Sequence, residues 1–351
     1  MPVITFRGRQ AARLENELLR VTVLQEGGHI AEIFDKRAGV SPLWIPHWTS
    51  MEPSQFDRQK PEQYGTGSEA KLLAGIMGHN LCLDLFGAPS EEEARLGQTV
   101  HGEGSIGRYD ITESPGELTL QLALPIAQLR FSRTIHLRNE QIKIQETVEN
   151  LSGMDRPLAW TQHVTLGPPF LDPATTQFEA SVTRSMVMEK DPGVGAYLLP
   201  GAVFSWPLAL RMDGNQANLR RMNSVAPAST YTAHLADPER EDAYFVAFSP
   251  HFRLAFGCIW KRSDFPWLGI WEENCSRPGL PWDGRTITRG MEFGVSPVPE
   301  SRKEMVNRNR LLDTPTFKWI PARGSLQAEY WFSSQLTDAV PQSLQWPTET
   351  F

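Results

Sequence analysis

The sequence predicts an all-β fold made of consecutive antiparallel strands. Helical periodicity is scarce along the 351 residues, whereas short alternating or β-branched runs recur. Glycine, proline, asparagine and aspartate separate these runs, and the chain contains 27 Gly and 27 Pro. Hydrophobic residues make up 40% of the chain, which is enough apolar material for a sizeable core. Successive antiparallel strands of this length favour a sandwich over an α/β fold.

Six segments show the clearest strand patterns. In chain order they are 18–24, 118–124, 129–137, Gln141–Asn150, 244–249 and 253–260. In Gln141–Asn150 the apolar residues alternate with polar ones, and Glu146 either interrupts the inward face or marks a bulge. We expect this segment to form a hairpin with 129–137 across residues 138–140.

Helices and long loops are expected in only a few places. Ser90 followed by three acidic residues predicts a short capped helix within 90–96, and another helical turn is expected within 299–312. Segments 52–67 and 191–195 are expected to run over the surface as loops, where functional residues commonly lie. Because no repeat, low-complexity tract or composition shift marks a linker, we predict a single domain over 1–351.

Composition and net charge limit the classes of binding partner that this protein can have. A net charge of −7 and a pI of about 5.7 argue against a nucleic acid, whose phosphates require a basic face, and favour a neutral or polar small molecule. No apolar run is long enough to cross a membrane and no secretory signal is recognised, so we expect a cytoplasmic protein without a membrane partner. The widely spaced Cys82, Cys258 and Cys275 are expected to be buried thiols rather than disulfide or metal ligands.

Three of the eight histidines have site-like surroundings. His101 lies in VHGEGSIGRY, where small residues allow a ligand close to the backbone and Glu103 is two positions away. His163 precedes a Gly-Pro-Pro turn, and His79 lies beside a glycine. For each, a structural role is the alternative. Motifs for phosphate, dinucleotide, serine-hydrolase, zinc or calcium chemistry are absent, so no metal site is predicted.

Acidic residues supply the other half of acid–base chemistry. Glu292 lies in the apolar, strand-like TRGMEFGVSP, where burial would raise its pKa toward a value useful for a general base. Glu272 and Glu273 end a comparable strand beside Trp271. A salt bridge or an edge position is the structural alternative for all three carboxylates.

Four stretches in fixed order resemble a known family. They are LENELLRVTVLQEGGHIAEIFDKRAG, HGEGSIGRY, NLSGMDRPLAWTQH and GMEFGVSPVPES, and the resemblance spans roughly residues 12–332. This order is similar to that of the galactose mutarotase-like, or aldose 1-epimerase, superfamily, as a divergent member. The resemblance implies one large antiparallel β-supersandwich.

The resemblance also assigns roles to individual residues. His163 corresponds to the general acid that protonates the ring oxygen, Glu292 to the general base, and His101 to the histidine of the family's HGG-type motif. In GIMGHNLC, His79 or Asn80 stands where a sugar-binding arginine is usual, and Asp242 in DAYFVAF is a candidate partner for a sugar hydroxyl.

Further substrate contacts are expected from Glu103, Trp271 and Glu272. Aromatic rings suit the apolar face of a sugar, so Trp260, Trp267 and Trp282 are additional candidates, with a core position as the alternative. Four arginines near these segments either bind an anionic substituent or are simply solvated: Arg108, Arg277, Arg285 and Arg289.

The predicted activity follows from this chemistry. Interconverting the anomers of a monosaccharide needs a base for the C1 hydroxyl and an acid for the ring oxygen, and the two roles reverse on ring closure. The expected partner is therefore a small-molecule carbohydrate, and neither a metal nor an organic cofactor is required. One alternative is a carbohydrate-binding or regulatory protein of the same fold without turnover. Another is a hydrolase, lyase or isomerase that acts on a larger saccharide in the same cleft.

Overall fold

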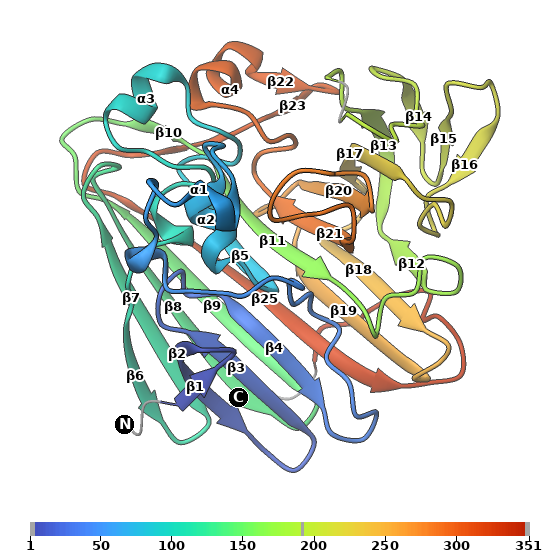
Figure 1. Cartoon of the computed structure of the whole chain (residues 1–351), viewed down its shortest axis with the longest axis horizontal. Coiled ribbons are helices and arrows are strands. Elements are labelled where there is room, and N and C mark those ends of the chain that lie inside the picture. Colours follow the sequence, from blue (N-terminus) through green and yellow to red (C-terminus); the bar gives the residue numbers. More distant parts are fainter. Residues whose placement is uncertain (1–3, 191–192, 348–351) are drawn as a thin grey trace.

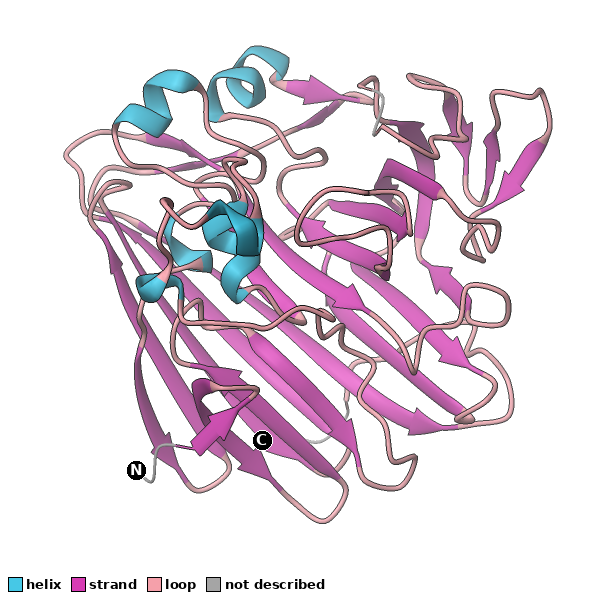
Figure 2. Cartoon of the chain, in the orientation of Figure 1, coloured by secondary structure: helices cyan, strands magenta, loops and turns pink. Residues whose placement is uncertain are grey.

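The computed structural model describes residues 4–190 and 193–347, which form two large antiparallel sheets packed face to face (Figures 1 and 2). The predicted large antiparallel β-sandwich is confirmed. Strands dominate, and the described residues contain four short α-helices.

The larger sheet has eleven strands and carries the candidate site. In spatial order they are β1 (Ile4–Phe6), β2 (Arg9–Glu15), β3 (Leu19–Leu24), β4 (Ile30–Asp35), β5 (His79–Leu83), β11 (Trp160–Leu166), β21 (Ile287–Gly294), β20 (Trp267–Asn274), β17 (Ala228–Ala236), β13 (Val182–Val187) and β14 (Val203–Ser205).

The second sheet has eight strands. In spatial order they are β12 (Gln177–Ala180), β18 (Asp242–Ser249), β19 (Leu254–Lys261), β25 (Ser325–Leu336), β9 (Gln141–Asn150), β8 (Leu129–Arg138), β7 (Glu117–Leu124) and β6 (Asp110–Ser114). Three small ribbons pair β10 (Arg156–Leu158) with β24 (Lys318–Ile320), β15 (Leu208–Leu210) with β16 (Gln216–Asn218), and β22 (Arg310–Leu311) with β23 (Thr314–Pro315).

Helices lie in the connections. They are η1 (Pro53–Gln55), α1 (Pro61–Tyr64), α2 (Ala70–Gly75), α3 (Glu91–Arg95), η2 (Glu103–Ser105) and α4 (Arg302–Arg308). The predicted cap is present, because Ser90 and Glu93 form a reciprocal capping box at α3. The turn expected within 299–312 is α4, whereas α1 and α2 were not predicted. Of the predicted surface loop 191–195, residues 191 and 192 lie outside the described residues.

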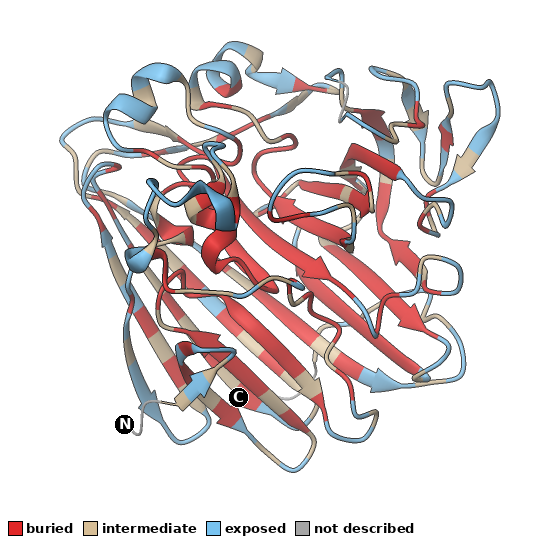
Figure 3. Ribbon diagram, viewed as in Figure 1, coloured by how far each residue is buried: buried red, intermediate tan, exposed pale blue. Residues whose placement is uncertain are grey.

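The core lies between the sheets (Figure 3). Buried side chains come from both of them, for example Leu81 of β5, Phe293 of β21, Ile144 of β9 and Phe332 of β25. Each of the six predicted strands matches an observed strand to within two residues. Alternating burial explains the match for β7, β8 and β9, because one face of each packs inward while the other meets solvent. In contrast, β3, β18 and β19 are almost wholly buried, and the last two follow continuous apolar runs of the sequence.

The predicted β8–β9 hairpin is present, and its connection is shorter than expected. Arg138 pairs with Gln141, so Arg138 belongs to the strand and only two residues make the turn. The register continues through Glu146 without a shift, which corrects the bulge alternative and places the carboxylate inside the core.

Glu146 is the centre of a buried polar cluster between the sheets. Its carboxylate accepts hydrogen bonds from Arg133 Nε (2.7 Å), Trp160 Nε1 (2.9 Å), Gln162 Nε2 (2.6 Å) and the Tyr330 hydroxyl (2.8 Å). A charged acceptor with four donors is fully satisfied, which is what makes such a group tolerable in a core. We call these five residues the inner cluster.

The structure also bears on the predicted state of the cysteines and on membrane-spanning helices. Cys82 and Cys258 are buried free thiols as predicted, but Cys275 is only partly buried because it lies in the turn after β20. Within the described ranges, no helix has the length and apolarity needed to cross a membrane.

Candidate active site

Strand register brings the two principal candidates together. His163 of β11 pairs directly with Glu292 of β21, and Glu292 pairs with Gly269 of β20. Directly paired residues of antiparallel strands project from the same face, so imidazole and carboxylate emerge side by side on the outer face of the larger sheet. His163 Nε2 lies 3.1 Å from Glu292 Oε1. The resemblance-based pair thus forms a direct contact.

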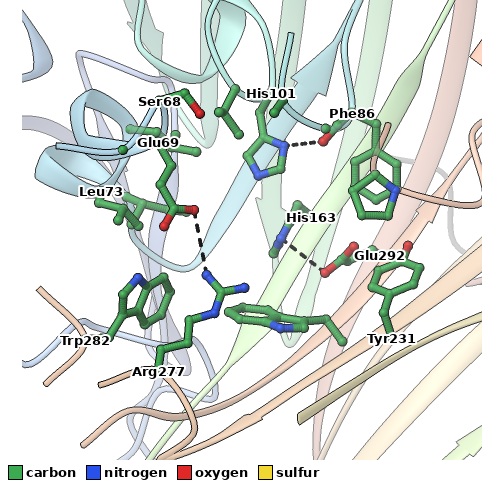
Figure 4. A pocket seen from close by; sticks show the side chains of 18 residues that line it. Ser68, Glu69, Leu73, Phe86, His101, His163, Tyr231, Arg277, Trp282 and Glu292 are labelled. Atoms are coloured by element: carbon green, nitrogen blue, oxygen red, sulfur yellow. Dashed lines mark hydrogen bonds and ion pairs between the residues drawn. The ribbon is translucent and has the colours of Figure 1, made fainter. Parts of the chain in front are cut away.

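Glycines make room for the carboxylate and its neighbour. A Cβ at Gly290 would lie 2.3 Å from Glu292 Oε1, and one at Gly269 would lie 2.1 Å from the Tyr231 hydroxyl. No real side chain tolerates such approaches, so these two positions must stay free of side-chain atoms for the present arrangement. The Tyr231 hydroxyl donates to Pro297 O at 3.1 Å and lies close to Glu292 (Figure 4).

His101 reaches the same place from a loop. Its backbone has a φ of 64°, and the following Gly102 has a φ of 77°. His101 Nδ1 lies 2.5 Å from the Phe86 carbonyl oxygen. Because a carbonyl can only accept, Nδ1 carries the proton and Nε2 is left as an acceptor. The rings of His101 and His163 have centroids 5.3 Å apart, and Nε2 of His101 faces the open space between them and Arg277 (Figure 4).

These groups line a cavity of about 450 Å³. One wall comes from the segment around α2 and includes Ser68 and Glu69. Trp282 and Arg277 form the wall beside it (Figure 4). Trp271 is also among the lining residues. A volume of this order suits a small molecule, and mostly apolar walls with a few convergent polar groups are typical of a ligand site.

Burial sets the protonation of the central pair. It raises the pKa of the Glu292 carboxyl to about 8, against a hydrogen bond with Tyr231 that opposes the rise. Burial and the neighbouring His101 hold the pKa of His163 well below its usual value. Burial likewise lowers the pKa of His101 to about 4. At neutral pH the Glu292–His163 pair therefore holds one proton, resting on Glu292.

The second nitrogen of His163 supports either position of that proton. Nδ1 lies 2.9 Å from Thr165 Oγ1, which accepts from Nδ1–H whether or not Nε2 is protonated. The proton on Glu292 is thus directed at His163 Nε2 and can pass to it across the 3.1 Å contact. Such a pair can donate and accept at neighbouring positions.

The structure does not bring His79 to the cavity. His79 is fully buried on the inner face of β5, and its Nε2 donates to Gln162 Oε1 at 2.9 Å. Its ring packs edge-on against Tyr330 and Phe332. Because β5 alternates, the neighbouring Asn80 faces the other way and pairs with His163 in register. Asn80 is buried, does not line the cavity, and its amide has no hydrogen-bond partner among the described residues.

Three other predicted substrate contacts also lie away from the cavity. The Glu103 carboxylate accepts from the backbone N–H groups of Ile126 and Ala127, which fixes a turn. Asp242 begins β18 in the second sheet, where it pairs with Lys261. Glu272 points to the inner face, where its carboxylate lies 3.4 Å from Arg289 and accepts from the Tyr197 hydroxyl at 2.7 Å.

The tryptophans and arginines divide in the same way. Trp271 and Trp282 line the cavity, whereas Trp260 and Trp267 are fully buried in the core. Of the arginines considered for an anionic substituent, Arg277 alone is among the lining residues. Arg289 is buried over the Phe178 ring, while Arg108 and Arg285 lie outside the cavity.

Sequence reasoning missed several lining residues. Tyr231 was hidden in a strand without a motif, and Phe86 contributes a backbone carbonyl that sequence does not reveal. The wall residues Leu72, Leu73 and Ile76 come from α2 and its C-cap. The stretch SEAKLLAG, rich in helix formers, was the available signal for this helix.

No metal arrangement accompanies the site. Over the residues that the structure describes, no group of three or more His, Cys, Asp or Glu side chains is placed to hold an ion.

Comparison with known proteins identifies the fold. No protein-family model matches the chain, and no curated protein does. Solved structures do match. A galactose mutarotase-like protein from Clostridium acetobutylicum gives a TM-score of 0.62 at 13% identity, covering 95% of this chain and 97% of that one. A proposed aldose 1-epimerase from Escherichia coli K12 gives 0.62 at 14% identity, covering 93% and 99%.

A third match is a galactose mutarotase related enzyme from Lactobacillus acidophilus, with a TM-score of 0.58 at 11% identity, covering 94% of this chain and 99% of that one. The chain therefore has the galactose mutarotase-like fold that the order of its motifs indicated.

Proposed function

We propose that this chain is an aldose 1-epimerase-like enzyme, which interconverts the anomers of a monosaccharide or sugar derivative by acid–base ring opening and closure. The observation that carries the proposal is the direct His163–Glu292 contact at the base of an open cavity. The two oxygens that exchange protons in a cyclic sugar share one carbon, so the acid and the base must themselves be neighbours. The fold of the solved mutarotase-like proteins supports the same assignment.

The steps follow from one shared proton. In the reactive form the proton has moved to His163 Nε2 and Glu292 is a carboxylate. Glu292 takes the proton of the C1 hydroxyl, the C1–ring oxygen bond breaks as C1=O forms, and His163 gives its proton to the ring oxygen. The aldehyde rotates about its bond to C2, and closure on the other face reverses both transfers. Proton transfer of this kind contributes about 10²–10⁴-fold per group.

His101 supports this chemistry as a neutral acceptor. Its Nδ1 is held by Phe86, so Nε2 is positioned to accept from a hydroxyl of the reacting centre and to orient it. None of these steps involves a metal or an organic cofactor.

The test is a mutarotation assay across a panel of free monosaccharides. Parent, Glu292→Gln and His163→Ala are compared, with polarimetric rates corrected for the uncatalysed reaction. Catalysis by the parent that both substitutions remove supports the proposal. Equal background rates in all three, together with saturable sugar binding, would instead identify a non-catalytic carbohydrate-binding protein.

A further inference from the structure

Arg277 lines the cavity, and its guanidinium makes two ion pairs but no hydrogen bond among the described residues. Its guanidinium carbon lies 5.3 Å from the centre of the Trp271 ring and 4.6 Å from that of Trp282. The nearest acidic atoms are Glu69 Oε2 at 3.7 Å and Glu273 Oε2 at 3.4 Å. Within the described ranges, no hydrogen bond from this guanidinium is found at these distances. Its planar fork of N–H groups is fixed by the two rings and remains available.

Glu69 and Glu273 flank this guanidinium but differ in what else they bind. Glu273 is fully buried and already accepts from Ser276 N (2.6 Å), Ser276 Oγ (2.6 Å) and Arg277 N (3.2 Å), so it shapes the turn that carries Arg277. Glu69 lines the cavity, and its carboxylate has no hydrogen-bond donor among the described residues. Glu69 and Arg277 therefore present an acceptor and a donor side by side.

We propose that Glu69 and Arg277 together bind two neighbouring hydroxyls of a neutral monosaccharide, away from its anomeric carbon. This inference rests on the proposed function. A diol offers donors and acceptors on adjacent carbons, which matches a carboxylate beside a guanidinium. Figure 4 places the pair across the cavity from Glu292, so a sugar held there presents its other end to the acid–base pair.

Charge balance favours a neutral sugar over an anionic one. One guanidinium lies within ion-pair distance of two carboxylates, so a phosphate or carboxylate placed on it would meet both. The two histidines of the cavity supply no compensating charge, because burial lowers the pKa of each. Arg277 thus serves as a hydroxyl donor rather than as an anion site.

The experiment combines side-chain substitutions in the protein with sugar analogues that lack single hydroxyls. Arg277→Met keeps an apolar stem between the tryptophans and removes the N–H groups, and Glu69→Gln changes only the partly exposed acceptor. Arg285→Met is the matched control, since Arg285 is in the same loop region and pairs with Asp283 outside the cavity. Binding of D-glucose, D-galactose and D-mannose is measured by calorimetry, with KM and kcat measured in parallel.

The best-bound sugar is then compared with its 3-deoxy and 4-deoxy analogues and its 6-phosphate. We expect Arg277→Met to raise Kd and KM about tenfold or more, because a hydrogen bond to a charged group is lost, while kcat stays within about threefold. One deoxy analogue should bind the parent about tenfold more weakly, yet bind Arg277→Met as well as the full sugar does. Glu69→Gln should show a smaller loss, and Arg285→Met none.

Several results would overturn the inference. It fails if parent and Arg277→Met discriminate equally against the deoxy analogues, or if Arg285→Met loses as much affinity as Arg277→Met. The inference also fails when the 6-phosphate binds more tightly than the neutral sugar, or when no neutral sugar shows saturable binding. The two proposals fail separately. If Arg277→Met and the deoxy analogue show coupled effects on binding but no mutarotation is seen, the proposed enzyme activity is wrong and the binding role of Glu69 and Arg277 stands. If mutarotation is seen without that coupling, only the binding role of Glu69 and Arg277 is wrong.

Discussion

Gln162 and His163 are neighbours on β11, yet their side chains enter opposite sides of the larger sheet. Gln162 joins the inner cluster, in which Glu146 accepts four hydrogen bonds and whose members are not among the residues that line the site cavity. His163 contacts Glu292, whose raised pKa leaves the pair one mobile proton beside an open cavity. Both groups are built around a buried glutamate. The difference is that the donors around Glu146 are all paired within the protein, whereas the proton of the Glu292–His163 pair lies where a ligand in the cavity could exchange it.

The largest effect is expected when the Glu292 carboxyl is replaced by an amide. Glu292→Gln removes the mobile proton and should lower kcat/KM by about 10²–10⁴-fold, while the free energy of unfolding falls little because the carboxyl is already neutral at pH 7. Rates and chemical denaturation of the same preparation check both parts. A variant that loses activity only because it unfolds would contradict the prediction.

The matched substitution on the inner face should do the opposite. Glu146→Gln leaves the fully buried Arg133 guanidinium without its carboxylate, so the free energy of unfolding should fall by about 3–5 kcal/mol. The folded fraction should keep most of its activity, because the cavity is untouched. Urea denaturation followed by fluorescence gives the stability, and kcat per folded molecule gives the activity. A stability change below about 1 kcal/mol would show that the inner cluster is not a structural unit.

A third prediction sharpens the role of space around the pair. Gly290→Ala places a methyl group 2.3 Å from the present position of Glu292 Oε1, so the carboxyl must shift and its contact with His163 changes. We expect a loss of about tenfold to a hundredfold in kcat with little change in KM, because misplacement by an ångström is costly in catalysis. Gly279→Ala is the control, since a Cβ there meets nothing within 4 Å. Unchanged kcat would argue that the observed contact is not the reactive geometry.

The smallest expected effect is the pH dependence of the pair. Between the lowered pKa of His163 and the Glu292 pKa of about 8, the pair holds one proton and is competent. Above about pH 8 that proton is lost, no acid remains for the ring oxygen, and kcat/KM should fall about tenfold per pH unit. The residual rate of Glu292→Gln should stay flat over the same range. A rate that rises through pH 8 would mean that the carboxylate acts without a shared proton.

The sequence predicts strands β7, β8 and β9 well because their inward and outward residues alternate. It predicts the central strands less well: β11 and β20 are buried on both faces, so nothing in their pattern tells an inward residue from an outward one. Trp271 and Glu272 illustrate this difficulty: both were predicted to contact the substrate, but as adjacent strand residues they project from opposite faces of the sheet. The same is true of His79 and Asn80 on β5.

The candidate acid–base residues His163 and Glu292 were found through the order of motifs, and their contact could be seen only once the strand register was known. The position of the Phe86 carbonyl and the packing of α2 against the cavity depend on tertiary contacts that no local pattern encodes. The single domain over 1–351 and the cytoplasmic location stay predictions.

The division of labour between strands and loops has an evolutionary consequence. His163, Glu292 and the glycines beside them lie on paired central strands, whereas Glu69 and Arg277 lie on connections at the edge of the cavity. Replacing connections leaves the strand ladder intact, so under the proposed function the substrate preference could change while the acid–base pair stays in place. Libraries confined to residues 67–76 and 276–283 should accordingly yield enzymes with new sugars but the same chemistry.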